Sequence, residues 1–165
     1  MSGEGIREAQ FYDVGDLFKL VKAMYESNDH YNKFTFDDES VIKLVTECIN
    51  KPNRFCWVGV DKEGEVISAF LGQLEYFSFS KEYFASDYGA YTYPEWRHTR
   101  VAYNLLKTFM SWAKAMEASE IHIGATNGFN QDGKRPYASR FGKFLQRKFG
   151  FTEAGSWYIQ DPKKI

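Results

Sequence analysis

YTYPEWRHTRVAYNLLKTFMSWAKA, residues 91–115, joins an extended aromatic segment to an amphipathic helix. The apolar residues of its helical half recur on one face, at Ala102, Leu105, Leu106, Phe109 and Ala113, and Met116 directly after the stretch continues this face. The helix start carries Arg97, His98 and Arg100, with no acidic residue beside them. A helix start presents unpaired backbone N–H groups and a partial positive charge, so extra cations there are unfavourable unless an anion binds. The stretch therefore predicts an anion site at the start of this helix.

Further elements follow from the hydrophobic periodicity on both sides of this stretch. Asp13 is a predicted cap for the first helix, and the second helix is predicted to begin near Asp37. The predicted order is strand, two helices, three strands, helix, strand, helix and a closing strand or strand pair, over residues 6–11, 14–25, 37–50, 55–60, 66–77, 84–93, 102–116, 120–126, 138–149 and 151–160. This order predicts an α/β (α+β) fold with a mixed, mostly antiparallel central sheet flanked by helices.

Composition narrows the class of protein. A length of 165 residues predicts one domain over 1–165, and an aromatic content of 18% favours a folded core over disorder. The net charge of −1 argues against a nucleic-acid partner, and the apolar runs are too short for a membrane span. No secretory leader opens the sequence, and Cys48 and Cys56 lack metal-ligand spacing. We therefore expect a cytoplasmic protein without a metal, in which both thiols are small core residues.

Two motifs resemble those of the GNAT acetyltransferase superfamily. PEWRHTRVA, residues 94–102, is similar to the family's turn and the phosphate-binding motif that opens a long helix. KFGFTEAGSWY, residues 148–158, resembles the Gly-Phe-x-x-x-Gly ending typical of the family. The predicted element order agrees from Ile6 to Gln160, so the resemblance covers nearly the whole chain. It implies a GNAT-type domain that moves an acetyl group from acetyl-coenzyme A to a primary amine by direct attack.

The resemblance also implies where the donor binds. In the family, backbone amides at the helix start hold the pyrophosphate, and the preceding strand pairs its backbone with the pantetheine arm. An Asn after the next strand often lies near that arm, although turn chemistry alone is the alternative here. The implied donor-binding residues are Tyr91, Thr92, Tyr93, Arg97, His98, Thr99, Arg100, Val101, Ala102, Asn127 and Asn130.

The sequence departs from the family pattern in two places. Arg100 stands where the family's first motif glycine is found, and it either turns outward to a phosphate oxygen or crowds the site. Gln146 stands where many relatives carry a tyrosine that protonates the leaving thiolate. Tyr137, at the start of the same predicted helix, is the nearest phenol by sequence and the candidate acid. The alternative for Tyr137 is packing against the preceding loop.

An attacking amine must be neutral, so a carboxylate or a chain of waters must take its proton. Glu75 and Asp87 lie on the central predicted strands and are the candidate bases; the alternative for each is a charge that faces solvent at a strand edge. Two histidines are also possible bases. His122 alternates with isoleucines and is expected to face outward, whereas His30 lies in the loop between the first two helices.

That loop and its flanks interleave acids with aromatic residues: Glu26, Asp29, Asp37, Asp38 and Glu39 among Tyr25, Tyr31, Phe34 and Phe36. This composition suits a cationic amine acceptor, and helix capping with core anchoring is the alternative. The acceptor classes left open are a small polyamine-like molecule, a modified base, and a lysine or N-terminus of a protein. Rival functions are a coenzyme A-binding or protein-binding module without turnover, and transfer of a different acyl group. A homodimer is also left open.

Overall fold

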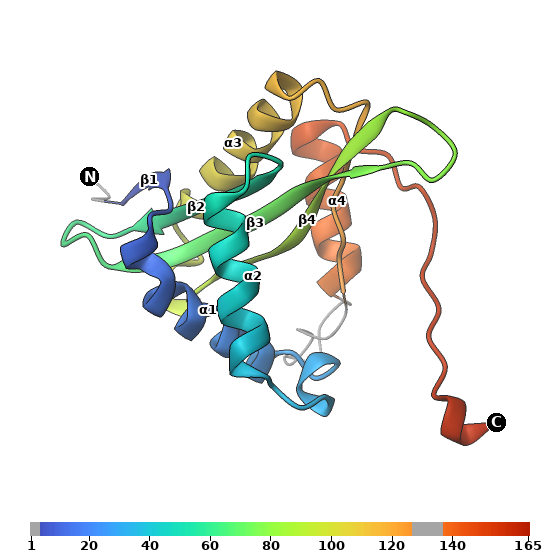
Figure 1. Ribbon diagram of the computed structural model, residues 1–165, viewed down its shortest axis with the longest axis horizontal. Helices are drawn as coiled ribbons and strands as arrows, with labels where there is room; N and C mark the ends of the chain where they lie inside the picture. The colour runs from blue at the N-terminus through green and yellow to red at the C-terminus, as the bar shows by residue number, and fades with distance from the viewer. Residues whose placement is uncertain (1–3, 127–136) are drawn as a thin grey trace. The chain divides into compact units, whose positions relative to one another are not determined.

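The computed structural model of the protein describes residues 4–126 and 137–165. The chain divides into two compact units, Met1–Gly124 and Ala125–Ile165, and each is described by itself. Its main elements, coloured along the chain in Figure 1, are β1 Gly5–Glu8, α1 Val14–Ser27, the 3-10 helix η2 Tyr31–Lys33, α2 Asp38–Asn50, β2 Arg54–Val60, β3 Val66–Tyr76, β4 Tyr83–Thr92, η3 Pro94–Trp96, α3 Val101–Ala115, β5 Glu120–His122 and α4 Tyr137–Phe149. None of the helices formed by the described residues has the length and apolarity to cross a membrane.

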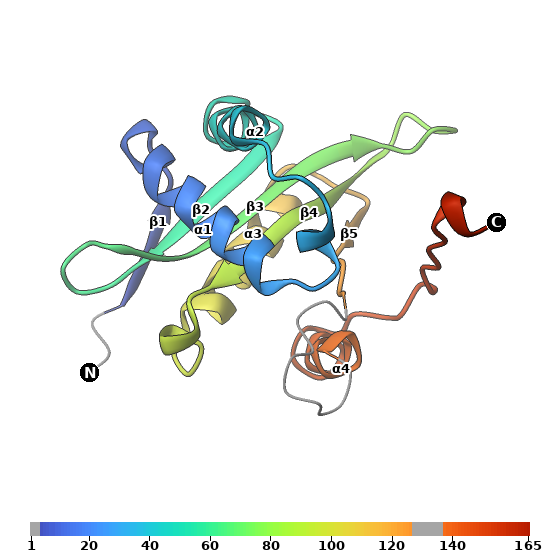
Figure 2. The ribbon, with the colours of Figure 1, turned by 90° about the horizontal axis from the view of Figure 1, so that it is seen from below.

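A five-stranded sheet forms the centre of the first unit. Its strands lie in the order β1-β2-β3-β4-β5, which Figure 2 shows from below. The first three neighbouring pairs are antiparallel, whereas β4 and β5 are parallel and are joined through α3. The predicted α/β (α+β) class, with a mixed and mostly antiparallel sheet flanked by helices, is therefore confirmed.

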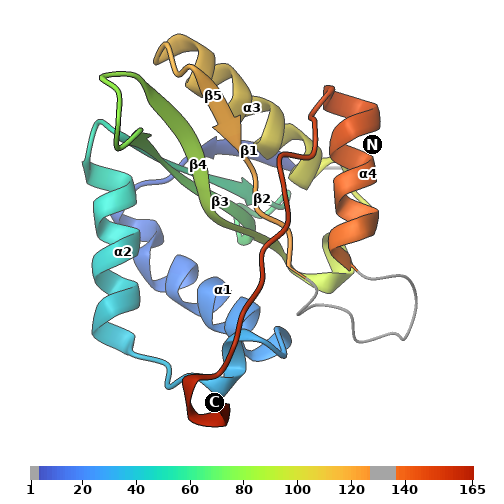
Figure 3. The same cartoon turned by 90° about the vertical axis from the view of Figure 1, so that its right-hand side faces the viewer.

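Helices cover both faces of this sheet, with α1 and α2 on one side and α3 on the other (Figure 3). Two glycines let α3 approach the sheet closely. A Cβ atom on Gly59 would lie 2.2 Å from Cγ2 of Val101, and one on Gly72 would lie 2.5 Å from the Phe109 ring. Since Val101 is the first residue of α3, the lack of a side chain at Gly59 fixes how close the helix start lies to the sheet.

The two cysteines lie in the core, as the sequence predicts. Cys48 in α2 and Cys56 in β2 are buried, and neither forms a disulfide. Burial raises the pKa of the Cys48 thiol to about 11. Both side chains therefore stay protonated near neutral pH and pack as small apolar groups.

Asp13 does not cap the first helix with its side chain, so that prediction is wrong. Its buried carboxylate instead accepts hydrogen bonds from Arg7 at 2.7 and 2.9 Å and from the Gln10 N–H at 2.7 Å. Burial raises the pKa of the Asp13 carboxyl, but the hydrogen bonds from Arg7 and Gln10 outweigh burial and hold the pKa below its usual value. The side chain therefore ties β1 to the start of α1.

Asp13→Ala should lower the free energy of unfolding by about 3 kcal/mol, since it leaves the partly buried Arg7 without its partner. Urea unfolding of parent and variant measures the difference. The stability that the Asp13 carboxylate contributes should be present above its unfolded-state pKa of about 3.9. It should be lost as the pH falls through the lower pKa that Asp13 has in the folded state. Asp16→Ala is the matched control, because Asp16 makes only an exposed 3.8 Å pair with Lys19 and should cost under about 1 kcal/mol. Equal losses in the two variants would contradict the assignment.

The second unit contains α4, which confirms the last predicted helix. Gly150 ends it at φ +72°, a left-handed conformation that favours glycine, and its N–H donates to the Gln146 carbonyl at 3.1 Å. The closing strand predicted over 151–160 is not formed, since no helix or strand is assigned to these residues. The aromatic residues of this segment have strand propensity, but a strand also needs a hydrogen-bonded neighbour, and the described residues provide none.

Candidate functional site

The candidate site is built around an irregularity in β4. Leu71 of β3 pairs with Gly89, but its neighbour Gly72 pairs with Asp87, so Tyr88 is an extra residue that forms a β-bulge. On the other side of β4, β5 pairs only with Phe84 to Ser86. The predicted strand over 120–126 is therefore shorter than expected. Beyond the bulge, β4 continues toward Thr92 without β5 as its neighbour.

From Tyr88 to Thr92, where β5 is no longer the neighbour of β4, the β4 backbone has polar groups on the side away from β3. Tyr93 N–H donates to the Ile67 carbonyl of β3 at 3.1 Å, and the Tyr91 carbonyl accepts from Ser68 Oγ at 3.2 Å. Backbone groups alternate sides along a strand, so those of Ala90 and Thr92 point the other way, although the Thr92 carbonyl already accepts from Arg97 Nε at 3.0 Å. An extended ligand with amide groups could pair with this edge as an added strand does.

Asp87 lies where β4 and β5 part. Its carboxylate oxygen Oδ1 accepts a hydrogen bond from the Gly124 N–H at 2.9 Å. Burial raises the pKa of the Asp87 carboxyl above its usual value, and the bond from Gly124 opposes that rise. Burial is the main cause that raises the pKa of Tyr31 in η2, and the charge of Asp87 raises it further. The loop between α1 and α2 therefore comes within the electrostatic range of Asp87, which suits a proton acceptor beside a bound amine.

Glu75 and His122 have more exposed surroundings than Asp87. Glu75, near the end of β3, is exposed and accepts a 3.1 Å hydrogen bond from Ser86 Oγ. His122 faces outward, as predicted, where it stacks on Phe84 with ring centroids 4.2 Å apart and contacts Glu120 at 2.7 Å. Both residues lie on the strands next to β4, which carries Asp87, and both are exposed to solvent.

The start of α3 holds the backbone donors that the sequence predicts. Among the described residues, no acceptor is found for the N–H groups of His98, Arg100 and Ala102. Thr99 bends the chain into the helix by donating from Oγ1 to the Trp96 carbonyl at 2.6 Å, and the Val101 N–H donates to the same Oγ1 at 3.4 Å. Free N–H groups and the helix dipole together make this helix start suitable for a phosphate group.

The two arginines at the helix start have different roles. Arg97 donates from Nε to the Thr92 carbonyl at 3.0 Å and lies over the Tyr91 ring, so it ties the loop to the end of β4. Arg100 is exposed, and its guanidinium lies over the Tyr103 ring at 5.2 Å. Its φ of −88° is ordinary for any L-residue, so no glycine is needed for the backbone conformation at this position.

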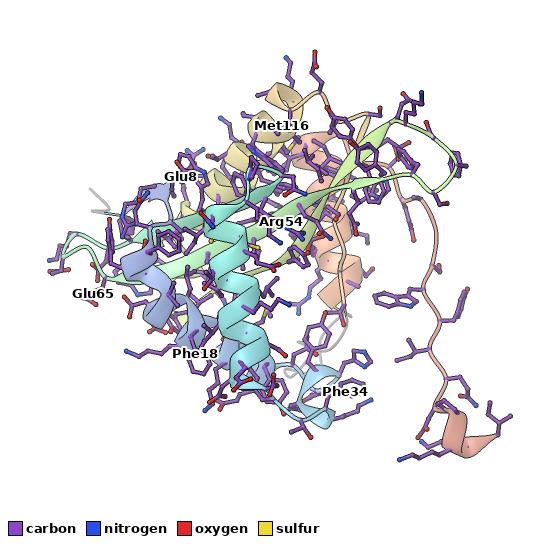
Figure 4. The ribbon with its side chains drawn as sticks, viewed as in Figure 1. Glu8, Phe18, Phe34, Arg54, Glu65 and Met116 are labelled. Carbon is purple, nitrogen blue, oxygen red and sulfur yellow. The ribbon has the colours of Figure 1, made fainter. Side chains whose placement is uncertain are left out.

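The aromatic residues of the loop between α1 and α2 divide into two groups. Phe36 packs against Phe18 and Tyr25, with centroids 5.8 and 4.9 Å away, and the Tyr25 hydroxyl donates to the Phe34 carbonyl at 2.5 Å. These contacts anchor the loop. Tyr31 and Phe34 have exposed rings near His30, and Figure 4 labels Phe34 at this end of the helix pair.

The acids of the same loop are mostly exposed. Asp37 caps α2 by accepting from the Ser40 N–H at 2.9 Å, so for this residue the capping alternative is confirmed. Asp38 and Glu39 are exposed in the first turn of α2, whereas Glu26 and Asp29 are exposed before η2. Buried Asn28 holds η2 in place, because its Oδ1 accepts from the N–H groups of His30 and Tyr31 at 3.0 and 3.1 Å.

Three predicted site residues cannot be placed in this geometry. Asn127 and Asn130 lie outside the described residues. Tyr137 begins α4 in the second unit, and its side chain lies outside the described part as well. Gln146 lies on α4 and is exposed. Within the described residues, no cluster of three or more His, Cys, Asp or Glu side chains is arranged to hold a metal ion.

The sequence predictions missed the bulged residue Tyr88 and its neighbour Gly89. Arg54 donates to the Tyr88 hydroxyl, which in turn donates to Oε1 of Gln73. A glycine inside a strand pattern is a known signal for a bulge, so Gly89 could have pointed to this position.

Known proteins match this chain by family and by fold. A family model described as the acetyltransferase (GNAT) family matches residues 21–142, and no curated protein sequence matches. The structure of AAC(6')-Iy in complex with the bisubstrate analog CoA-S-monomethyl-acetylneamine is 13% identical, with a TM-score of 0.71 over 97% of this chain and 98% of that one. The aminoglycoside 6'-N-acetyltransferase AAC(6')-Ih from Acinetobacter baumannii is 15% identical, with a TM-score of 0.68 over 96% and 97%. A predicted acetyltransferase from Clostridium acetobutylicum with acetyl-CoA is 14% identical, with a TM-score of 0.71 over 98% of each chain. At these identities the structures show a shared fold.

Proposed function

The chain belongs to the acetyltransferase (GNAT) family, and on that premise we propose that it transfers an acetyl group from acetyl-coenzyme A to a primary amine. The observation that carries the proposal is the parting of β4 and β5 beside a helix start with free backbone N–H groups. The phosphates would bind at the start of α3, at His98, Arg100 and Ala102. The pantetheine arm would then follow β4 from Thr92 toward the bulge.

The bulge is the proposed place of reaction. The amine nitrogen attacks the thioester carbonyl carbon, the new C–N bond forms, the C–S bond breaks, and coenzyme A leaves as a thiolate. The attacking nitrogen loses one proton, and we assign its removal to Asp87, directly or through one water. A thiol has a pKa of roughly 8.5, judged by cysteine, so the thiolate can leave near neutral pH with modest help. Tyr137 stays the proposed acid on sequence grounds alone.

We propose a cationic acceptor that enters beside η2. The support is the exposed pair Tyr31 and Phe34 next to Glu26 and Asp29, since aromatic faces and carboxylates both attract an ammonium group. Two of the similar structures are of aminoglycoside acetyltransferases, which agrees with a polyamine-like acceptor without selecting one. A single domain over 1–165, a cytoplasmic location and a homodimer stay predictions.

A rival proposal is a coenzyme A-binding module without turnover, which the family departures at Arg100 and Gln146 favour. Thermal shift with coenzyme A, followed by thiol release from acetyl-coenzyme A with a panel of polyamines, amino sugars and lysine peptides, separates the two. We expect stabilisation by coenzyme A and thiol release with at least one cationic amine. Stabilisation with no thiol release across the panel would support the binding module, and no stabilisation at all would contradict both.

A further inference from the structure

We propose that the acyl group of the donor reaches into an apolar pocket behind the β4 bulge, so that the enzyme accepts a short acyl chain longer than acetyl, with Met24 setting the limit. This inference rests on the proposed function and specifies its donor. It concerns the first unit only, since each residue that lines the pocket lies before Gly124.

The pocket has a volume of about 40 Å³ and lies between the α1–α2 pair and the β3–β4 strands. A cavity needs about 10–15 Å³ to hold one water, so the space holds roughly three groups of that size. Apolar side chains make up nearly all of the wall, and a cavity of this kind favours an alkyl group over water. The lining residues are Leu20, Val21, Met24, Leu44, Ala69, Leu71, Tyr88, Gly89 and Tyr91.

The strand that would guide the donor also forms one wall of the pocket. From Thr92 back to Tyr88, β4 spans five residues at about 3.3 Å each, and this is the stretch that β5 does not pair with. An arm that follows it from the start of α3 ends at the bulge. Tyr88, Gly89 and Tyr91 all belong to this stretch and all line the pocket. The thioester would therefore lie directly in front of the pocket.

The walls differ in how easily they move. The Tyr88 ring is held by hydrogen bonds of its hydroxyl with Arg54 and Gln73, so it is a fixed wall. Met24 is a flexible thioether, and its Sδ lies 3.5 Å from where a Cβ atom on Gly89 would be. That distance is ordinary van der Waals contact, so an alanine at position 89 would fill the opening without a clash. The missing side chain of Gly89 leaves a methyl-sized space beside the strand, and Met24 lies against that space, so the flexible thioether must move for a longer acyl chain to enter.

The test compares acetyl-, propionyl- and butyryl-coenzyme A as donors to one amine, by kcat/KM for thiol release. We expect the parent to use propionyl within about threefold of acetyl. Gly89→Ala should lower the propionyl-to-acetyl ratio on the order of tenfold, since one methylene more or less in an apolar pocket is worth about that much. Met24→Ala should raise the butyryl-to-acetyl ratio by a similar factor, and Met24→Leu, which conserves volume, should keep the parent ratios.

Several outcomes would overturn the inference. A parent that prefers acetyl over propionyl by more than a hundredfold has no usable room, and ratios unchanged in both Gly89→Ala and Met24→Ala place the acyl group elsewhere. If no donor releases thiol, the proposed function fails separately, and binding then decides the inference. In that case thermal shift should show tighter binding of propionyl- than of acetyl-coenzyme A to the parent, and Gly89→Ala should reverse that order. Equal shifts for all donors in both proteins would refute the pocket.

Discussion

Asp87→Asn should lower kcat by about 10²–10⁴-fold, the usual worth of a general base, while the affinity for coenzyme A stays within about twofold. The amide oxygen of asparagine can still accept the 2.9 Å hydrogen bond from Gly124, so the parting of β4 and β5 should survive. Only the capacity to take a proton is lost. Steady-state thiol release with a verified amine, together with a coenzyme A titration, measures the two quantities.

The pH dependence of the parent gives an independent check on Asp87. Because burial raises the pKa of its carboxyl, the proton-free form is lost at a higher pH than for an exposed aspartate. We expect kcat/KM to fall as the pH decreases through that raised pKa, and Asp87→Asn should lack this acidic limb. The variant should also be at least as stable as the parent at neutral pH, since it removes a charge whose burial is unfavourable.

Glu75 supplies the discriminating comparison, since it was the other candidate base. Glu75→Gln keeps the shape of an exposed side chain that accepts a hydrogen bond from Ser86. A smaller fall in kcat than for Asp87→Asn is expected. If Glu75→Gln instead shows the larger fall and the loss of the acidic limb, the base is Glu75 and the assignment of Asp87 is wrong.

Arg100→Glu should weaken coenzyme A binding by about 10–100-fold, the range expected for a charge-assisted hydrogen bond. The change sets a carboxylate beside N–H groups that would hold phosphate, so the ligand meets repulsion in place of attraction. Calorimetric titration at several salt concentrations measures this, and the salt dependence of binding should be weaker in the variant than in the parent.

Lys107→Glu is the matched control for Arg100→Glu. Lys107 lies two turns along the same helix, and its ammonium is near the same Tyr103 ring, with 5.9 Å between nitrogen and centroid. The field of a helix start falls off within its first turn, so this reversal should change the affinity less than threefold. Arg100→Gly adds a second reading: unchanged or tighter binding means that the arginine only crowded the site, and weaker binding means that it contacts phosphate. Equal losses from Arg100→Glu and Lys107→Glu would indicate a general charge effect and no phosphate site at α3.

The sequence predicts the elements of this fold well where local patterns decide them. The apolar stripe from Ala102 to Met116 places α3 within one residue of its observed range, and the turn after Val60 separates β2 from β3 as expected. Two predictions failed because a distant partner decides the outcome. The Asp13 carboxylate bonds to Arg7 in β1 in place of the helix that follows, and residues 151–160 form no strand.

The candidate site was only partly visible in the sequence for the same reason. The helix start with its cations and N–H donors follows from residues that are neighbours in the chain. The point where β4 and β5 part cannot be predicted in this way, because the hydrophobic alternation along β4 does not indicate where its pairing with β5 ends. Glu75 and Asp87 look alike in sequence, and only the bulge and the Gly124 N–H separate their surroundings.

The short ladder between β4 and β5 also has a consequence for the solubility of the protein. Within the described residues, only Glu120–His122 pair with β4 on that side, so the stretch beyond the bulge is a strand edge that β5 does not cover, with the Thr92 carbonyl bonded to Arg97. Such an edge is a template for pairing with other chains, which leads to aggregation. A bound donor arm would cover it. On the proposed function, binding of the donor would then also affect how much of the protein stays dispersed.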